Sequence, residues 1–146
     1  MISRFDGEYF FLSNFYQCKV VYDGIEYGSA EAAFQAAKTT DYDTRCIFAK
    51  LNPSQAKRLG RTIQLRPDWE DIKFKIMKDI VTRKFTQNFD LKQKLLYTGN
   101  EKLIEGNSWH DYIWGMNFSC TIGENNLGKI LMEVRDELKG NKEVAL

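Results

Sequence analysis

The sequence predicts a single compact α+β domain over residues 1–146, in which an N-terminal β-hairpin or small sheet packs with several helices. Two short runs rich in β-forming residues, Cys18–Tyr22 and Ile25–Tyr27, flank the dipeptide Asp23–Gly24, which is favoured in type I′ hairpin turns. After residue 30, apolar residues recur at helical spacing between residues that cap helices. The length of 146 residues suffices for one hydrophobic core and is short for two.

The first helices are predicted from their caps. Ser29 precedes an alanine-rich run and is the expected N-cap of a helix over residues 30–39. Asn52 and Pro53 open a short helix, with asparagine as the cap and proline at the first helical position. Gly60 is expected to end it.

The C-terminal half is predicted to be mostly helical. Asp68 is the expected cap of a helix over residues 69–87, and a second helix starts at Asp90 and ends at Gly99. The longer helix carries an apolar stripe formed by Trp69, Ile72, Ile76, Met77, Ile80 and Val81.

A short strand and a long loop precede the last predicted helix. The segment Lys102–Glu105 has the pattern of a short strand, and the residues from Gly106 to the last helix mix turn formers with aromatic residues. An ordered loop of this length in a compact domain is often functional. The last helix is expected over residues 127–139, with Asn125 or Asn126 as its cap and Gly140 as its end.

Composition limits the classes of function. Hydrophobic residues make up 43% and charged residues 28%, as in ordinary globular proteins. The net charge of +1 argues against a strongly basic nucleic-acid surface, although a local basic patch stays possible. Three scattered cysteines, one histidine and no C-x-x-C motif favour reduced thiols in the cytoplasm and argue against zinc. No signal peptide and no membrane-spanning segment are predicted.

The most informative polar residues lie on the predicted helix 30–39. Glu31 and Lys38 are seven positions apart, close to two helical turns, and Gln35 lies between them on the same face. Polar groups on a buried face are costly unless they bind each other or a ligand. One interpretation is a helix whose polar groups pair with loop backbone. The other is a lysine nucleophile beside a carboxylate, since desolvation favours the neutral amine that can form a Schiff base.

A second candidate group lies in the long loop, where Trp109, His110, Asp111 and Trp114 fall within six positions. Both tryptophans suit a core, or they could form the walls of a pocket for a planar base. A lone histidine is a weak signal. An aspartate among aromatic residues must be hydrogen-bonded or functional. We expect Asp111 and Trp114 to face the same pocket as Lys38.

Two further segments are weaker candidates. Ser13 and Asn14 interrupt an aromatic run, either as an Asx-turn or as contacts to a polar ligand. Arg61 follows Gly60 and is either an exposed charge or a phosphate ligand that uses its planar guanidinium.

Taken in order, these segments resemble the NADAR superfamily, also described as YbiA-like or RibX-like N-glycosidases. The matching segments span nearly the whole chain, and the ordered set is much more specific than any one of them. They are Phe11–Phe15, Asp23–Gly24, Glu31–Lys38, Ala56–Arg61, Asp68–Trp69, Lys84–Phe85, Leu95–Gly99, Trp109–Gly115 and Asn126–Arg135. Many members have a histidine directly after the helix glutamate, where this chain has Ala32.

The resemblance implies a hydrolase that cleaves an N-glycosidic bond to ribose without a metal or other cofactor. Its catalytic residues would be Lys38, Glu31 and Asp111. Its substrate contacts would be Ser13, Asn14, Gln35, Arg61, Trp109 and Trp114. The first expected substrate is ADP-ribose on guanine, in a nucleotide or DNA. The alternatives are a ribosylamino-pyrimidine intermediate of early riboflavin synthesis and, in another class, a module that binds ADP-ribose without cleaving it.

Overall fold

The computed structural model describes the backbone of residues 1–144 and the side chains of residues 1–140. Its contacts divide the chain into two compact units, residues 14–88 and residues 1–13 with the chain from residue 89 onward. The elements confirm the predicted α+β class, and the prediction of one domain over residues 1–146 stays a prediction.

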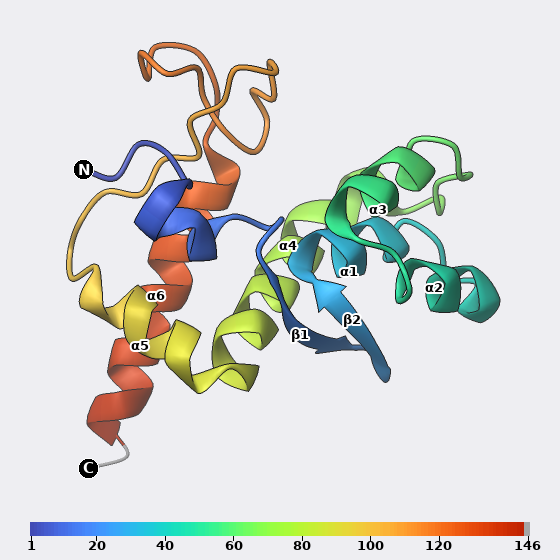
Figure 1. Ribbon diagram of the computed structural model, residues 1–146, viewed down its shortest axis with the longest axis horizontal. Coiled ribbons are helices and arrows are strands. Elements are labelled where there is room, and N and C mark those ends of the chain that lie inside the picture. The colour runs from blue at the N-terminus through green and yellow to red at the C-terminus, as the bar shows by residue number, and fades with distance from the viewer. Residues whose placement is uncertain (145–146) are drawn as a thin grey trace. The chain divides into compact units, whose positions relative to one another are not determined.

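The unit of residues 14–88 begins with an antiparallel hairpin (Figure 1). Its strands are β1 (Gln17–Tyr22) and β2 (Ile25–Ser29), and Tyr22 pairs with Ile25 across the turn. Both turn residues have positive φ, 52° at Asp23 and 83° at Gly24. This is the geometry of a type I′ turn, so the predicted hairpin is confirmed.

Helix α1 (Ala30–Ala36) follows β2 directly. It begins as predicted, with the Ser29 hydroxyl accepting a hydrogen bond from the Ala32 N–H at 3.1 Å. The predicted end at residue 39 is wrong, because the chain leaves the helix after Ala36. Lys38 lies in the following turn, where its carbonyl accepts from the Arg66 N–H at 2.8 Å and so ties the turn to a distant loop.

Helix α2 (Tyr42–Phe48) was not predicted from the sequence. Its signal is the N-cap Asp41, whose carboxylate accepts from the Thr44 N–H at 2.9 Å. The buried Arg45 of α2 donates to the Asp23 carboxylate at 2.6 Å and so joins the helix to the hairpin turn.

Helix α3 (Pro53–Gly60) confirms the predicted start. Asn52 and Gln55 form a reciprocal capping box, and Pro53 occupies the first turn.

Helix α4 (Trp69–Gln87) carries the predicted apolar face, of which Trp69, Ile76, Met77, Ile80 and Val81 are buried and Ile72 is half-buried. Asp68 was predicted as its cap, and this is wrong in detail. Its carboxylate accepts from the Arg66 guanidinium at 2.7 and 3.2 Å and makes no cap hydrogen bond.

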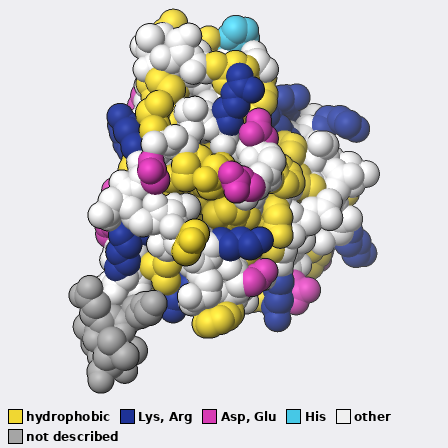
Figure 2. All heavy atoms as spheres, turned by 60° about the vertical axis from the view of Figure 1, so that its left-hand side comes forward, with side chains coloured by type: hydrophobic (Ala, Val, Ile, Leu, Met, Phe, Trp, Pro, Cys, Tyr) yellow, Lys and Arg dark blue, Asp and Glu magenta, His cyan; other side chains and the backbone are white. Residues whose placement is uncertain are grey.

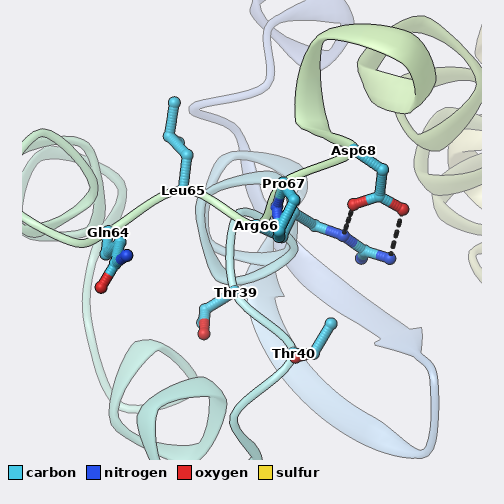
Figure 3. A pocket seen from close by; sticks show the side chains of 7 residues that line it. All are labelled: Thr39, Thr40, Gln64, Leu65, Arg66, Pro67 and Asp68. Carbon is cyan, nitrogen blue, oxygen red and sulfur yellow. Dashed lines mark hydrogen bonds and ion pairs between the residues drawn. The ribbon is translucent and has the colours of Figure 1, made fainter.

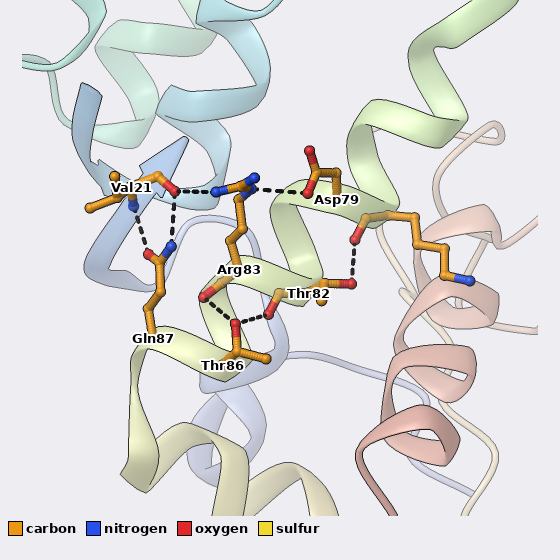
Figure 4. A network of polar contacts seen from close by, with 7 residues as sticks. Val21, Asp79, Thr82, Arg83, Thr86 and Gln87 are labelled. Carbon is orange, nitrogen blue, oxygen red and sulfur yellow. Dashed lines mark hydrogen bonds and ion pairs between the residues drawn. The ribbon is translucent and has the colours of Figure 1, made fainter. Parts of the chain in front are cut away.

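Polar contacts attach α4 to the hairpin (Figure 4). The Gln87 amide accepts from the Val21 N–H at 2.7 Å and donates to the Val21 carbonyl at 2.9 Å. The Gln87 side chain thus satisfies both the N–H and the C=O of Val21 on β1. The result is a fixed support beneath α1, which packs on α4 and on both strands.

Lys84 of α4 makes stability depend on pH. It is 1% exposed, and burial lowers the pKa of its amine from 10.5 to about 8. Between these values the unfolded chain binds more protons than the folded protein, so stability rises with pH across this window and the full penalty applies below pH 8. We expect Lys84→Met to remove this rise, which amounts to roughly 3 kcal/mol.

Urea unfolding between about pH 7 and 10 measures this slope. Lys75→Met, an exposed substitution on the same helix, is the matched control and should keep the wild-type slope. An unchanged slope in Lys84→Met would contradict the assignment.

The other unit contains a 3-10 helix, η1 (Gly7–Leu12), and two helices that pack together, α5 (Phe89–Tyr97) and α6 (Asn126–Val144). The strand predicted at Lys102–Glu105 is wrong, because only an isolated bridge forms there, between Leu103 and Ile2. The predicted end at Gly140 is also wrong. Helix α6 continues through this glycine to Val144, at a cost of about 1 kcal/mol relative to alanine.

The long stretch from Gly106 to α6 is a loop, as predicted, and the Asn125 side chain anchors its end. Asn125 accepts from the Glu105 N–H at 2.9 Å and donates to the Leu103 carbonyl at 3.0 Å. Figure 2 shows the single histidine at the surface, and large apolar side chains of the loop are also exposed, namely Trp109, Ile113, Phe118 and Ile122. Among the described residues no helix has both the length and the apolarity needed to cross a membrane.

Candidate active site

Helix α1 carries a buried carboxylate–amide pair. Glu31 and Gln35 are 8% and 6% exposed, and the Gln35 amide N–H donates to Glu31 Oε1 at 2.9 Å. The Gln35 Oε1 atom is buried and accepts no hydrogen bond from the described residues. The two side chains predicted to share a face are therefore joined directly, which fixes the orientation of the Glu31 carboxylate.

Gly60 allows α3 to approach this pair. A methyl group built on Gly60 would lie 1.9 Å from Gln35 Oε1, so any larger residue would displace the amide. From the sequence, Gly60 was predicted only to end the helix. Its close packing against Gln35 is a second reason for glycine, one that no local sequence signal shows.

Lys38 lies half-buried in the turn after α1. Burial is the main cause that lowers the pKa of its amine, and the positive charges of Arg61 and Lys57 lower it further. The Glu31 carboxylate acts in the opposite direction. The net lowering raises the fraction of neutral, nucleophilic amine at a given pH.

Lys57 lies on α3 and Arg61 is the residue that directly follows its last residue, Gly60, four positions after Lys57. Both act electrostatically on Lys38, so three cations and the Glu31 carboxylate form one group. Lys57 Nζ also lies 5.7 Å from the centre of the Phe15 ring. Sequence reasoning named Arg61 and missed Lys57, whose spacing from Arg61 was the available signal.

Asn14 supports the start of α1. Its backbone carbonyl accepts from the Glu31 N–H at 3.0 Å, and its buried side-chain amide contacts the Met77 sulfur at 3.4 Å. Ser13 is half-buried, and its N–H donates to the Phe10 carbonyl at 2.9 Å. Their contacts with substrate stay predictions.

A second group of predicted site residues lies in the loop before α6, in the unit that contains η1, α5 and α6. Asp111 Oδ1 accepts from the N–H groups of Trp114 at 3.0 Å and Ile113 at 3.2 Å, so Asp111 stabilises the turn that carries Trp114. The buried Asn107 in turn holds Asp111 by accepting from its N–H at 3.1 Å and donating to its carbonyl at 3.0 Å. Sequence reasoning missed Asn107, since an asparagine in a loop is a weak signal.

The other two predicted loop residues, Trp109 and His110, are exposed. Trp109 is 58% exposed, and His110 has a φ of 66° with its Nδ1 at 2.7 Å from the Tyr112 hydroxyl. The structure gives this histidine a local hydrogen bond. The expectation that Asp111 and Trp114 face the same pocket as Lys38 stays a prediction.

Comparison with known proteins identifies the family. A sequence model of the NADAR domain matches residues 3–139. The chain belongs to the NADAR family. The solution structure of the Escherichia coli protein YbiA is similar to this NADAR chain, with a TM-score of 0.83 and 32% identity over 97% of this chain and 89% of that one. The predicted superfamily and fold class are confirmed.

Curated relatives of this NADAR chain carry functional names. The N-glycosidase YbiA of Escherichia coli is 35% identical over 86% of this chain and 79% of its own length. An N-glycosidase of Nostoc punctiforme is 44% identical over 64% of this chain and 60% of its own length. A riboflavin biosynthesis protein of Vibrio vulnificus is 39% identical over 92% of this chain and 37% of its own length.

The chain thus spans less than two thirds of the Nostoc and Vibrio proteins. The N-glycosidase names agree with the predicted enzyme class, that of hydrolases acting on N-glycosyl compounds.

Proposed function

We propose that this chain hydrolyses the bond between a ribose C1 and a base nitrogen, with Lys38 as the nucleophile. The observation that carries the proposal is the group around Lys38, where burial and two cations favour a neutral amine beside a buried carboxylate. A neutral amine is the form that attacks an electrophilic carbon.

In the proposed mechanism, Lys38 Nζ forms a bond to C1 as the bond between C1 and the base breaks. The base leaves with a proton from a carboxyl group, and Nζ loses its own proton as the sugar ring opens to a Schiff base. Water then adds to the C=N bond, which returns the free amine and releases the sugar. Glu31 and Asp111 are the two proposed proton donors and acceptors, and Trp114 is the proposed wall beside sugar or base.

The first proposed substrate is ADP-ribose attached to guanine. Lys57 on α3 and Arg61 directly after this helix offer two cations four residues apart, which suits a diphosphate better than a single phosphate. No metal or other cofactor enters the proposed steps. We place this activity in the cytoplasm, which keeps thiols such as Cys18, Cys46 and Cys120 reduced.

We expect Arg61→Ala to weaken binding of ADP-ribose by roughly 1.5–3 kcal/mol, the range for hydrogen bonds to charged groups. Isothermal titration calorimetry with ADP-ribose measures this change. Arg58→Ala is the matched control, since Arg58 is an exposed arginine three residues before Arg61 and is not among the charges that act on Lys38. Equal affinity in Arg61→Ala and Arg58→Ala would remove Arg61 from the site.

A second candidate substrate is a ribosylamino-pyrimidine phosphate, favoured by the riboflavin biosynthesis name of the Vibrio vulnificus relative. It carries one phosphate and a smaller base. Incubation with both substrates, followed by mass spectrometry of the products, separates the two. Free ADP-ribose with released guanine or guanine nucleotide supports the first substrate, and cleavage of the pyrimidine compound alone supports the second. Tight ADP-ribose binding without any cleavage would mean a binding module and would overturn the proposed activity.

A further inference from the structure

A hollow of about 540 Å³ begins at the residue after Lys38 and opens to solvent (Figure 3). Its size falls within the range of sites for small molecules. One side is formed by the turn after α1 and the other by the loop between α3 and α4. The lining residues are Thr39, Thr40, Gln64, Leu65, Arg66, Pro67 and Asp68.

The two sides of this hollow are tied together at Lys38. The Arg66 N–H donates to the Lys38 carbonyl at 2.8 Å, and the Arg66 guanidinium reaches the Ala37 carbonyl at 3.5 Å. The same guanidinium holds Asp68 by two hydrogen bonds, at 2.7 and 3.2 Å. The pocket is therefore fixed in position relative to the backbone of Lys38.

The lining is close to neutral in charge. The Arg66–Asp68 pair cancels its own charge, and Arg66 holds the pKa of the Asp68 carboxyl below its usual value, so the pair stays ionised at neutral pH. The other groups are the Gln64 amide, two threonine hydroxyls and the apolar Leu65 and Pro67. In Figure 3 the side chains of Gln64 and Thr39 point to the same side of the view and Leu65 to the opposite side.

This chemistry suits a neutral, planar nitrogen heterocycle and does not suit a phosphate. An amide can donate to and accept from the edge of such a ring, and an apolar side chain such as Pro67 can contact its face. The cations available for phosphate are instead Lys57 on α3 and Arg61 directly after it, and both act electrostatically on Lys38. The backbone of Lys38 therefore adjoins a neutral pocket, and the charges of Lys57 and Arg61 act on its amine.

We propose that this pocket, the Thr39–Asp68 pocket, binds the leaving base and that Gln64 reads the edge of that base. The inference rests on the proposed N-glycosidase function. In that function the base would occupy the pocket, the phosphates would lie at Lys57 and Arg61, and the bond to be broken would lie between them, at Lys38. Gln64 is then a specificity-determining residue of the site.

Separate titrations with a base compound and with a phosphate compound test whether the two bind at the different places proposed. Neither titration requires turnover. Amide chemical shifts are followed by NMR during titration of guanosine, of a diaminopyrimidine and of pyrophosphate. We expect either guanosine or the diaminopyrimidine to shift the amide signals of residues 39–40 and 64–68 saturably. We expect pyrophosphate to shift the amide signals of α3. The base that binds more tightly identifies the source of the heterocycle. No saturable base binding, or shifts elsewhere, would overturn the proposal.

The Gln64→Ala variant sharpens the test. Losing one hydrogen bond between neutral groups should weaken base binding roughly three- to tenfold and leave pyrophosphate affinity unchanged. Gln93→Ala, an exposed glutamine on α5, is the control and should change neither affinity. Equal base affinity in the Gln64 variant and the wild type would overturn the role of Gln64. A wild type that binds base in this pocket and cleaves no substrate would instead contradict the proposed activity alone.

Discussion

Replacing Lys38 by alanine is expected to lower turnover by more than about a thousandfold while the protein stays folded, because no other group supplies the nucleophile in the proposed mechanism. Lys38 lies half-buried in a turn, and its backbone carbonyl, which holds Arg66, is kept in the variant. Single-turnover rates, with circular dichroism to check the fold, measure the effect.

Two control variants distinguish a nucleophilic role of Lys38 from a purely electrostatic one. Lys38→Arg keeps the positive charge and removes the amine, so it should be as inactive as Lys38→Ala. Lys50→Ala removes an exposed lysine of the same unit and should keep full activity. An active Lys38→Arg variant would show that Lys38 acts by charge alone.

Replacing Glu31 by glutamine has the second largest expected effect, a fall of about 100- to 10,000-fold in turnover with little change in binding. The variant keeps the shape of the side chain and its place beside Gln35 and removes the charge. Loss of binding at an unchanged rate would instead make Glu31 a residue that positions the substrate. Glu26→Gln, an exposed substitution on β2, is the matched control.

The same variant has a predicted pH signature. The Glu31 carboxylate raises the pKa of Lys38, against the larger lowering by burial and the further lowering by Arg61 and Lys57. Removing the Glu31 charge should lower the pKa of Lys38 further. The increase of residual activity with pH should therefore occur at a lower pH in Glu31→Gln than in the wild type. If the increase of activity occurred at a higher pH in the variant than in the wild type, the proximity of Glu31 and Lys38 would be contradicted.

Much of the fold could be predicted because its signals are local. The Asp23–Gly24 turn requires two positive φ angles, and the Asn52 capping box involves only residues three positions apart. The predictions that were wrong depend on distant partners. Asp68 stands at the predicted N-cap position of α4, but its carboxylate binds Arg66 and makes no cap hydrogen bond. Helix α1 ends early, where the Lys38 carbonyl accepts from the Arg66 N–H.

The candidate site shows the same division. Glu31 and Gln35 could be found from helical spacing, and their hydrogen bond confirms the shared face. Lys57 was missed because its importance comes from electrostatic action on Lys38, which lies on another element. The tight fit of Gly60 against Gln35 is likewise a tertiary contact that no single segment reveals.

The most direct test of the account is borohydride trapping during turnover, followed by peptide mass spectrometry. If Lys38 forms a Schiff base, reduction should leave a stable ribosyl adduct on Lys38, absent in Lys38→Arg and absent when substrate is omitted. Efficient turnover with no adduct on Lys38, or with an adduct on another lysine, would contradict Lys38 as the nucleophile.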